Sequence, residues 1–335
     1  MRIDTIEVSD ALDYLKSLPD ESANCCVTSP PYWGLRDYKV DGQLGMERTP
    51  EEYVARMVAI CAEVRRVLRK DGTLWINLGD TFWGGKGQNG LHIATRPQDG
   101  RLPGMKPKDL VGIPWLVAFA LRNAGWYLRQ DIIWAKPNPM PESVRDRCTK
   151  AHEYIFMLSK SARYFYDAEA VAEAGTHHGT DARPFGSAGG NRRDERRVYT
   201  PPTNGTIHRK GRTDKQRGHS RRHQGFNDRW DAMKRAGQCS GMRNKRSVWT
   251  VPTHPFSGAH FATFPPSLIE PCIKAGCPEG GVVLDPFMGA GTTALVANRL
   301  GRHFMGCDLN PEYVEMARQR VLRDAPLFNT RKEKP

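Results

Sequence analysis

The chain has 335 residues, 39% of them hydrophobic, and a net charge of +13, which fits one large domain or two smaller ones. No apolar run approaches the roughly 20 residues of a membrane span and no apolar signal region follows Met1, so we expect a soluble, cytoplasmic protein. The eight cysteines are scattered without a Cys-x-x-Cys pair, which argues against a disulfide framework and against a metal site.

The first 170 residues alternate between strand-like and helix-like segments. This rhythm predicts a mostly parallel α/β sheet, and residues 153–159 with 163–166 suggest a late antiparallel hairpin. One apolar face from Val54 to Leu68 supports a long helix that ends before Gly72. The expected strands are residues 2–8, 23–28, 73–78 and 127–134, and the expected helices are residues 11–18, 50–69 and 109–123.

A proline-rich loop, Ser29-Pro30-Pro31-Tyr32, follows the predicted strand that ends at Thr28. Active sites of α/β folds lie where strands end. The two prolines stiffen the backbone and remove two N–H donors, so the Ser29 hydroxyl and the Pro30 carbonyl can accept the two hydrogens of an aromatic amine. Tyr32 offers a flat ring on which a base can stack. The tetrapeptide by itself is equally compatible with a plain turn.

The amine of cytosine or adenine needs such help, because its lone pair is delocalised into the ring. Two acceptors that hold the amine hydrogens direct the lone pair towards an electrophilic methyl group, so positioning and electrostatics supply most of the catalysis. A base inside a duplex cannot reach such a loop, and the loop therefore implies base flipping.

A basic insert spans residues 175–246. It holds 18 Lys and Arg against 6 Asp and Glu, a net charge of +12, whereas the rest of the chain has 32 against 31. This distribution indicates a polyanion-binding surface attached to a nearly neutral enzyme core. Its low apolar content also fits a solvated loop that is partly disordered without DNA. Its five histidines lack metal-ligand spacing with cysteines.

The C-terminal part returns to the α/β pattern around a glycine loop. Residues 282–284 and 303–307 are expected strands, and residues 264–275, 292–300 and 311–323 are expected helices. Gly289 and Gly291 in the connecting turn let the backbone pass close to a ligand at a helix N-terminus. Asp308 ends the second strand, where an acid suits the two hydroxyls of a ribose.

Three ligand classes compete for this loop. A P-loop would need a lysine, whereas the chain has Gly291-Thr292-Thr293. A dinucleotide would place a pyrophosphate beside Asp285, which would repel it, and too few residues remain for a complete dinucleotide fold. Asp285 instead suits the ammonium of a methionine moiety beside a sulfonium. A strand–turn–helix without a ligand is the remaining alternative.

Together these motifs resemble the β arrangement of the amino-methylating DNA methyltransferases, in which the catalytic loop comes first and the cofactor loop last. The resemblance implies a circularly permuted, doubly wound methyltransferase fold with S-adenosyl-L-methionine as cofactor. It makes residues 1–174 and 247–335 the catalytic domain and residues 175–246 the target-recognition region. It also implies a bacterial or phage-encoded monomer or dimer that acts on double-stranded DNA, with a cognate restriction endonuclease as a further partner.

The resemblance assigns roles to individual residues. The catalytic residues are Ser29, Pro30, Pro31 and Tyr32. Asp10 matches the position of a family residue near the cofactor adenine, and this is the least specific of the assignments. Residues 260–265 match a segment whose aromatic residue packs against the cofactor. The cofactor-binding residues are Asp10, Thr28, Phe264, Pro265, Asp285, Pro286, Phe287, Gly289, Gly291, Thr292 and Asp308.

Ser29 is the residue that bears on the target base. In the family, Ser-Pro-Pro-Tyr usually accompanies N4-cytosine methylation, and Asp- or Asn-Pro-Pro-Tyr usually accompanies N6-adenine methylation. We therefore expect cytosine, with adenine as the alternative. Methylation of RNA or of a protein amide, a non-catalytic DNA-binding protein and a nicotinamide-dependent dehydrogenase are rival functions. Binding of S-adenosylmethionine and methyl transfer to duplex DNA would separate them.

Overall fold

A computed structural model describes residues 2–35, 37–83, 104–174, 242–253 and 264–324. The chain divides into two compact units, one of Met1–Val171 with Lys245–Pro335 and one of Ala172–Asn244. In the described part of the smaller unit, β6 (Glu173–Ala174) and β7 (Met242–Arg243) form an antiparallel pair, which the Arg243–Glu173 ion pair at 3.0 Å supports. Residues 175–241, most of the predicted recognition region, lie outside the described residues.

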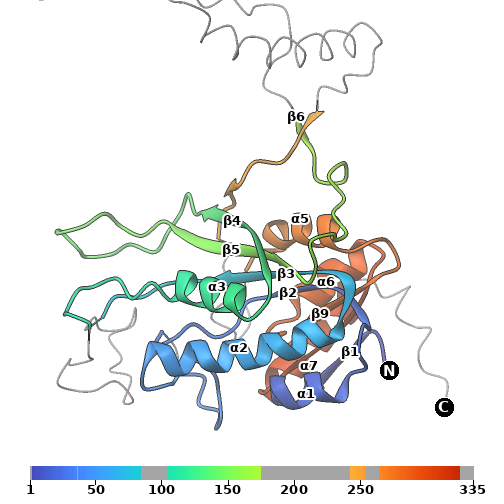
Figure 1. The fold of residues 1–335 in the computed structure, drawn as a ribbon, viewed down its shortest axis with the longest axis horizontal. Helices are drawn as coiled ribbons and strands as arrows, with labels where there is room; N and C mark the ends of the chain where they lie inside the picture. The colour runs from blue at the N-terminus through green and yellow to red at the C-terminus, as the bar shows by residue number, and fades with distance from the viewer. Residues whose placement is uncertain (1, 36, 84–103, 175–241, 254–263, 325–335) are drawn as a thin grey trace, which may run out of the picture. The chain divides into compact units, whose positions relative to one another are not determined.

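The larger unit is built on an eight-stranded sheet with the order β1-β10-β9-β2-β3-β5-β4-β8. Figure 1 labels six of these strands, β1, β9, β2, β3, β5 and β4. Every neighbouring pair is parallel except the two pairs that β5 makes with β3 and β4. The sheet confirms the predicted α/β class. Its strands are β1 (Thr5–Val8), β2 (Ala23–Thr28), β3 (Leu68–Leu78), β4 (Tyr127–Ala135), β5 (His152–Ser159), β8 (Val248–Thr250), β9 (Val282–Asp285) and β10 (His303–Asp308).

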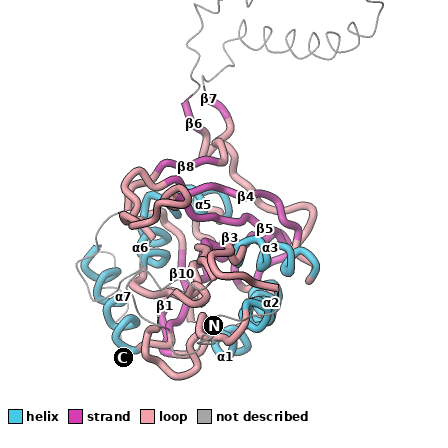
Figure 2. Tube along the Cα trace, turned by 90° about the vertical axis from the view of Figure 1, so that its left-hand side faces the viewer, coloured by secondary structure: helices cyan, strands magenta, loops and turns pink. Residues whose placement is uncertain are grey.

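Helices cover both faces of this sheet, as Figure 2 shows end-on. One core contains buried side chains of α1 (Ala11–Ser17), α2 (Pro50–Val67) and α3 (Ile113–Asn123), with Leu74 and Ile76 from the sheet. The other contains those of α5 (Pro266–Gly276), α6 (Thr292–Arg299) and α7 (Pro311–Asp324), with Trp75. Alternate residues of β3 thus enter opposite cores, as the two-residue period of a strand requires. None of the described helices is long and apolar enough to cross a membrane.

The adjacent strands β9 and β2 mark the point where the winding of the sheet reverses. From β9 the chain crosses through α6 to β10 on one side, and from β2 it crosses through α2 to β3 on the other side and over the opposite face. Ligands of open α/β sheets bind outside the carboxyl ends of strands at such a switch point. The loops that follow β2 and β9 are the two that the sequence singled out.

One predicted pairing is wrong. Residues 163–166 do not form a strand, and β5 lies between β3 and β4 instead, with Trp75 opposite Met157. Within the expected second strand, Phe165 N donates to Asp71 O at 2.9 Å, and directly after it Asp167 N donates to Ala275 O at 2.9 Å. The short strand β8, beside β4, was not expected.

Several predicted ends shift by a few residues. Helix α2 ends at Val67 rather than at residue 69, and β3 begins at once at Leu68. Helix α3 begins at Ile113 rather than at residue 109, because Gly112 before it has the left-handed φ of 82°. Helix α5 begins at Pro266, two residues after its predicted start, with Pro265 as the preceding cap.

Candidate active site

The two loops are joined directly at the switch point. Thr28, the last residue of β2, donates from Oγ1 to Asp285 Oδ1 at 2.6 Å, although the two residues are 257 positions apart in the sequence. Both side chains are buried. One hydrogen bond therefore fixes the end of β2, from which the proline-rich loop starts, against the start of the glycine loop.

Asp285 is the centre of this junction. It is 1% exposed, and besides Thr28 it accepts from Thr293 Oγ1 at 2.6 Å and from Phe287 N at 3.0 Å. Burial raises the pKa of the Asp285 carboxyl to about 6, against the lowering effect of these three donors. The carboxylate thus supplies a negative charge beneath the turn while it holds the two loops together.

The glycine turn has the backbone that the sequence suggested. Gly289 and Gly291 have φ angles of 52° and 75°, in the region that favours glycine. A Cβ at Gly291 would lie 2.8 Å from the Cβ of Ala317 in α7, so this position needs glycine for space as well. The turn ends at Thr292, the first residue of α6, and leaves an N-terminus of the kind that binds polar ligand groups.

Asp308 closes the other side of the turn. Its Oδ2 accepts from Gly289 N at 2.8 Å, and its Oδ1 accepts from Asn310 N at 2.9 Å. Burial raises the pKa of the Asp308 carboxyl above its ordinary value. This acid lies at the end of β10 and in contact with the glycine turn, where the sequence placed a ribose-binding residue.

Asp10 lies near this edge but has a local structural task. Its Oδ1 accepts from Leu12 N at 2.8 Å and from Asp13 N at 3.3 Å, which caps α1. The residue before it, Ser9, donates from its backbone N–H to Asp308 O at 3.1 Å. Asp10 therefore belongs to the same strand-end region as Asp308, with its carboxylate oriented by the helix cap.

The remaining residues that the sequence predicted to bind the cofactor differ in their burial and in their contacts. Phe287 and Phe264 are half-buried and pack against the two cores, and Pro265 and Pro286 are buried. The Thr292 hydroxyl accepts from Arg320 at 2.9 Å, whereas the hydroxyl that reaches Asp285 is that of Thr293, which the sequence did not single out. Residues 260–263 of the segment that leads into Phe264 lie outside the described residues.

The proline-rich loop is held by its second proline. Tyr53 in α2 donates from its hydroxyl to the Pro31 carbonyl at 2.9 Å. No hydrogen bond to the Pro30 carbonyl occurs among the described residues, which leaves that oxygen available as the predicted acceptor. Ser29 is half-buried, and its hydroxyl makes a long 3.4 Å contact with the Tyr32 hydroxyl.

Tyr32 is fixed at both its ring and its hydroxyl. Its Oη lies 2.7 Å from Glu153 Oε2 and 3.0 Å from Asn77 Oδ1. A Cβ at Gly79 would lie 2.5 Å from the Tyr32 ring, so the absence of a side chain there makes room for it. Burial, followed by the negative charge of Glu153, raises the pKa of the Tyr32 phenol well above its ordinary value. Tyr32 therefore stays a neutral phenol and cannot serve as a base near neutral pH.

The sequence reading missed the residues around the Tyr32 hydroxyl. Asn77 comes from the end of β3, Glu153 from the start of β5, and Lys136 follows β4 and forms an ion pair with Glu153. The signal was available, because polar residues at strand ends are candidates for an active site. It was hidden because β5 runs antiparallel, so that its first residues, rather than its last, lie at the edge with Tyr32.

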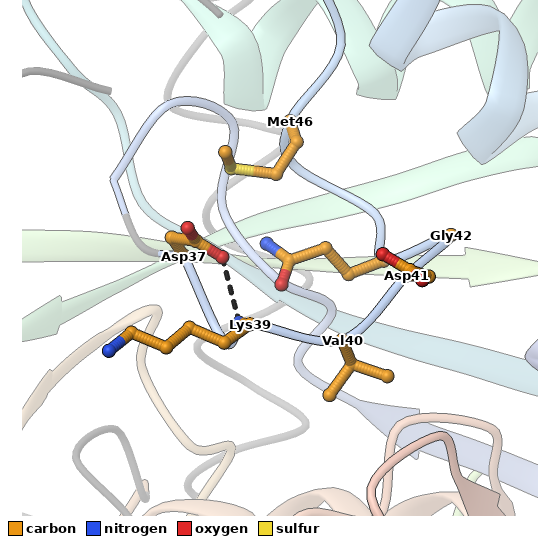
Figure 3. Close-up of a pocket in the computed structure, with 7 residues that line it drawn as sticks. Asp37, Lys39, Val40, Asp41, Gly42 and Met46 are labelled. Atoms are coloured by element: carbon orange, nitrogen blue, oxygen red, sulfur yellow. Dashed lines mark hydrogen bonds between the residues drawn. The ribbon is translucent and has the colours of Figure 1, made fainter. Parts of the chain in front are cut away.

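A surface hollow of about 350 Å³ lies in the loop that follows the catalytic motif (Figure 3). It is lined by Asp37, Lys39, Val40, Asp41, Gly42, Gln43 and Met46, and Asp37 Oδ1 accepts from Lys39 N at 2.7 Å within it. The hollow is open and contains none of the residues that surround the Asp285 junction. Its polar contacts serve the fold of the loop itself. Across the described ranges, no group of three or more His, Cys, Asp or Glu could hold a metal ion.

Comparison with known proteins agrees with this geometry. The sequence profile of a DNA methylase family, which groups N6- and N4-methylating enzymes, matches residues 23–319. The chain belongs to this family. The methylase is 42% identical over 329 residues to the type II methyltransferase M.XycI of Xanthomonas campestris pv. cyanopsidis, a match that covers 96% of the chain and 88% of the relative. It is 39% identical over 324 residues to the type II methyltransferase M.SmaI of Serratia marcescens. This match covers 95% of the chain and 90% of M.SmaI.

Two solved structures share the fold of the methylase. One is a DNA modification methylase of Thermus thermophilus in complex with S-adenosyl-L-methionine, with a TM-score of 0.56 and 24% identity over 97% of this chain and 96% of that one. The other is the cytosine-N4-specific PvuII DNA methyltransferase, with a TM-score of 0.59 and 17% identity. This match covers 97% of this chain and 92% of the PvuII chain. The predicted methyltransferase fold is thereby confirmed. The protein is a site-specific, S-adenosylmethionine-dependent DNA methyltransferase of the N4-cytosine/N6-adenine class.

Proposed function

We propose that this methylase transfers a methyl group to the N4 amine of cytosine in double-stranded DNA, after the cytosine has been flipped out of the duplex. The observation that carries the proposal is the Thr28–Asp285 hydrogen bond, because it joins the catalytic loop to the cofactor loop at the switch point of the sheet. The choice of cytosine rests on Ser29. The likeness to the cytosine-N4-specific PvuII enzyme is a likeness of fold.

The residues of the glycine loop fit S-adenosylmethionine. When bound, this cofactor supplies a methyl group on a sulfonium, which leaves as the sulfonium becomes a thioether. Gly289 and Gly291 give a ligand close access to the backbone, Asp308 suits the ribose hydroxyls, and the charge of Asp285 favours the cationic methionine moiety through space. Asp10 would lie near the adenine of the cofactor, and Phe264 would pack against the cofactor.

The chain's own residues then prepare the amine. The Ser29 hydroxyl and the Pro30 carbonyl accept its two hydrogens and direct the nitrogen lone pair towards the methyl group. The Tyr32 ring stacks on the flipped base and excludes water from one side of it. When bound, the cofactor would supply the methyl group to this nitrogen, and the surplus proton of the methylated amine would pass to water.

The test is to incubate the purified protein with radiolabelled S-adenosylmethionine and unmethylated genomic DNA, and then to digest the DNA and identify the labelled nucleoside. We expect N4-methylcytosine. Label found only in N6-methyladenine would overturn the cytosine assignment and establish the alternative, adenine.

The basic insert and the partners belong to the same proposal. The +12 charge of residues 175–246 would neutralise DNA phosphates and make this region the one that recognises the target. The relatives M.XycI and M.SmaI are named type II methyltransferases, which supports a cognate restriction endonuclease in the host. We expect a monomer or a dimer in solution.

A further inference from the structure

The Tyr32 hydroxyl lies in a small polar cluster that no part of the methyl-transfer chemistry requires. The cluster consists of Tyr32, Asn77, Lys136 and Glu153, and it joins the catalytic loop to three neighbouring strands, β3, β4 and β5. A stacking platform needs only a ring, and a phenylalanine would provide one. The hydroxyl and its partners therefore call for a separate explanation.

Glu153 is the hub of the cluster. Its Oε2 accepts from Tyr32 Oη at 2.7 Å and from Asn77 Nδ2 at 3.2 Å, while its Oε1 pairs with Lys136 Nζ. The side chain of Glu153 is 16% exposed and that of Lys136 is 17% exposed. A carboxylate so far removed from water is retained only where charge and hydrogen bonds compensate it, and each of its oxygens has such a partner.

The partners of Glu153 are themselves fixed. Asn77 also donates from Nδ2 to Tyr154 O at 3.1 Å, so its amide cannot rotate freely. Lys136 Nζ lies 4.3 Å from the centre of the Trp134 ring, and Trp134 Nε1 donates to Val251 O at 2.8 Å. Contacts with the sheet and with Val251 thus hold both partners of the carboxylate that binds the tyrosine hydroxyl.

We propose that Glu153, with Lys136 as its counter-ion, is a positioning residue that sets the orientation of the Tyr32 ring for the flipped base. Gly79 restricts the ring from one side and the Glu153 carboxylate anchors its far end, so the ring is presented in a fixed orientation before DNA binds. Such preorganisation matters because a displacement of about 1 Å at a reacting group can reduce a rate roughly a hundredfold. This inference rests on the proposed function of Tyr32.

The test uses single-turnover methylation of unmethylated genomic DNA, with enzyme in excess over sites and radiolabelled S-adenosylmethionine. The variants are Tyr32→Phe, Glu153→Ala, Glu153→Gln and the Tyr32→Phe/Glu153→Ala double variant. Glu142→Gln is the matched control, because Glu142 forms a similar ion pair, with Arg147 at 2.6 Å and a side chain 22% exposed, between β4 and β5. Thermal unfolding and the dissociation constant for S-adenosylmethionine are measured for each.

We expect Tyr32→Phe and Glu153→Ala each to lower the single-turnover rate about tenfold or more, with cofactor affinity within about twofold of the wild type. Because both act through one hydrogen bond, the double variant should be no more than about threefold slower than the slower single variant. Glu153→Gln keeps an oxygen that accepts from Tyr32 and should recover most of the rate. Glu142→Gln should match the wild type.

Losses that multiply in the double variant, or a Glu153→Gln rate as low as that of Glu153→Ala, would overturn the positioning role. If Glu153→Ala does not fold, Tyr32→Phe tests the proposal, because it leaves the Glu153–Lys136 ion pair intact. A wild-type rate in Tyr32→Phe would refute the anchoring of Tyr32 by Glu153. Failure of the wild-type protein to label cytosine would refute the proposed function instead. Normal labelling with unaffected variants would refute the anchor alone.

Discussion

Ser29 and Tyr32 differ in how far the fold depends on them. Among the residues that the structure describes, the Ser29 hydroxyl makes only the 3.4 Å contact with Tyr32. The Tyr32 hydroxyl is bound to Glu153 and Asn77, and its ring occupies the space beside Gly79. Removal of the serine hydroxyl therefore disturbs little besides the acceptor that the proposed mechanism uses. Removal of the tyrosine side chain also takes one of its donors from the partly buried Glu153 carboxylate, which keeps Asn77 and Lys136.

Ser29→Ala is accordingly the cleaner test of the catalytic loop. We expect it to lower the methylation rate by about a hundredfold, by analogy with the loss of one preorganised hydrogen-bonding group at a reacting centre, with an unchanged melting temperature. Tyr32→Ala should also abolish methylation while cofactor binding persists. Ser22→Ala, which removes a hydroxyl that bonds to Pro19 O, is the control. Full activity of Ser29→Ala would exclude Ser29 as an acceptor for the amine.

The buried charge of Asp285 predicts a pH-dependent affinity for the cofactor. Because burial raises its pKa to about 6, the carboxyl loses its charge as the pH falls through this value. Affinity for the cationic cofactor should be constant above about pH 7 and should fall below pH 6 by up to about tenfold per unit. Calorimetric titration at constant ionic strength measures it. Asp285→Asn should bind weakly at all pH values, and an identical profile in both proteins would exclude Asp285 as the group responsible.

The raised pKa of Asp285 affects the stability of the fold in the opposite direction from its effect on cofactor affinity. A carboxyl whose folded pKa exceeds its unfolded value stabilises the fold most when protonated, and this contribution is present below about pH 4 and lost as the pH rises through about 6. Near neutral pH, the charged Asp285 therefore lowers the free energy of unfolding of the cofactor-free protein. That cost is consistent with a charge retained for binding.

At the scale of elements, the glycine turn between β9 and α6 carries the clearest prediction. Gly291→Ala meets two obstacles, a φ of 75° and a Cβ contact of 2.8 Å with Ala317 in α7. We expect a loss of about 2–4 kcal/mol in the free energy of unfolding, the sum of backbone strain and displacement of α7, and weaker cofactor binding. Denaturant titration and calorimetry measure the two effects.

Gly301→Ala is the matched control at the other end of α6. Its φ of 68° is similar, but no atom of the described part of the chain lies within 4 Å of the added Cβ. It should lose only the backbone part, about 1–2 kcal/mol, and bind the cofactor normally. Equal losses in the two variants would mean that the contact with Ala317 is unimportant.

The elements also explain what the sequence could and could not reveal. Strands β2 and β9 are short apolar runs that end in Thr28 and Asp285, so local pattern and strand-end position were enough to predict both loops. Strand β5 was found as a strand but given the wrong partner, because the aromatic residues at 164–166 fit a strand pattern equally well. Pairing of β5 with β3 depends on tertiary contacts that local sequence does not encode. The Glu153–Tyr32 contact was lost with that pairing.

At the scale of the whole molecule, charge is divided unevenly between the catalytic core and the insert. The core is nearly neutral, and residues 175–246 carry a net charge of +12. In a protein that binds DNA phosphates, each contact releases counterions, so binding weakens steeply as salt rises. The insert is therefore expected to determine the salt dependence of DNA binding while the core determines the affinity for the cofactor.

Replacement of Arg192, Arg193, Arg196 and Arg197 by Gln tests this division of labour. If all four contact phosphates, the slope of log affinity for duplex DNA against log salt should become shallower by about 4, since each contact contributes about 0.9. Fluorescence anisotropy over a range of salt concentrations measures the slope. Calorimetry should give an unchanged affinity for S-adenosylmethionine, because the residues that surround the glycine turn all lie in the larger unit. An unchanged slope would show that these arginines do not contact the backbone, and a changed cofactor affinity would contradict the separation of the two tasks.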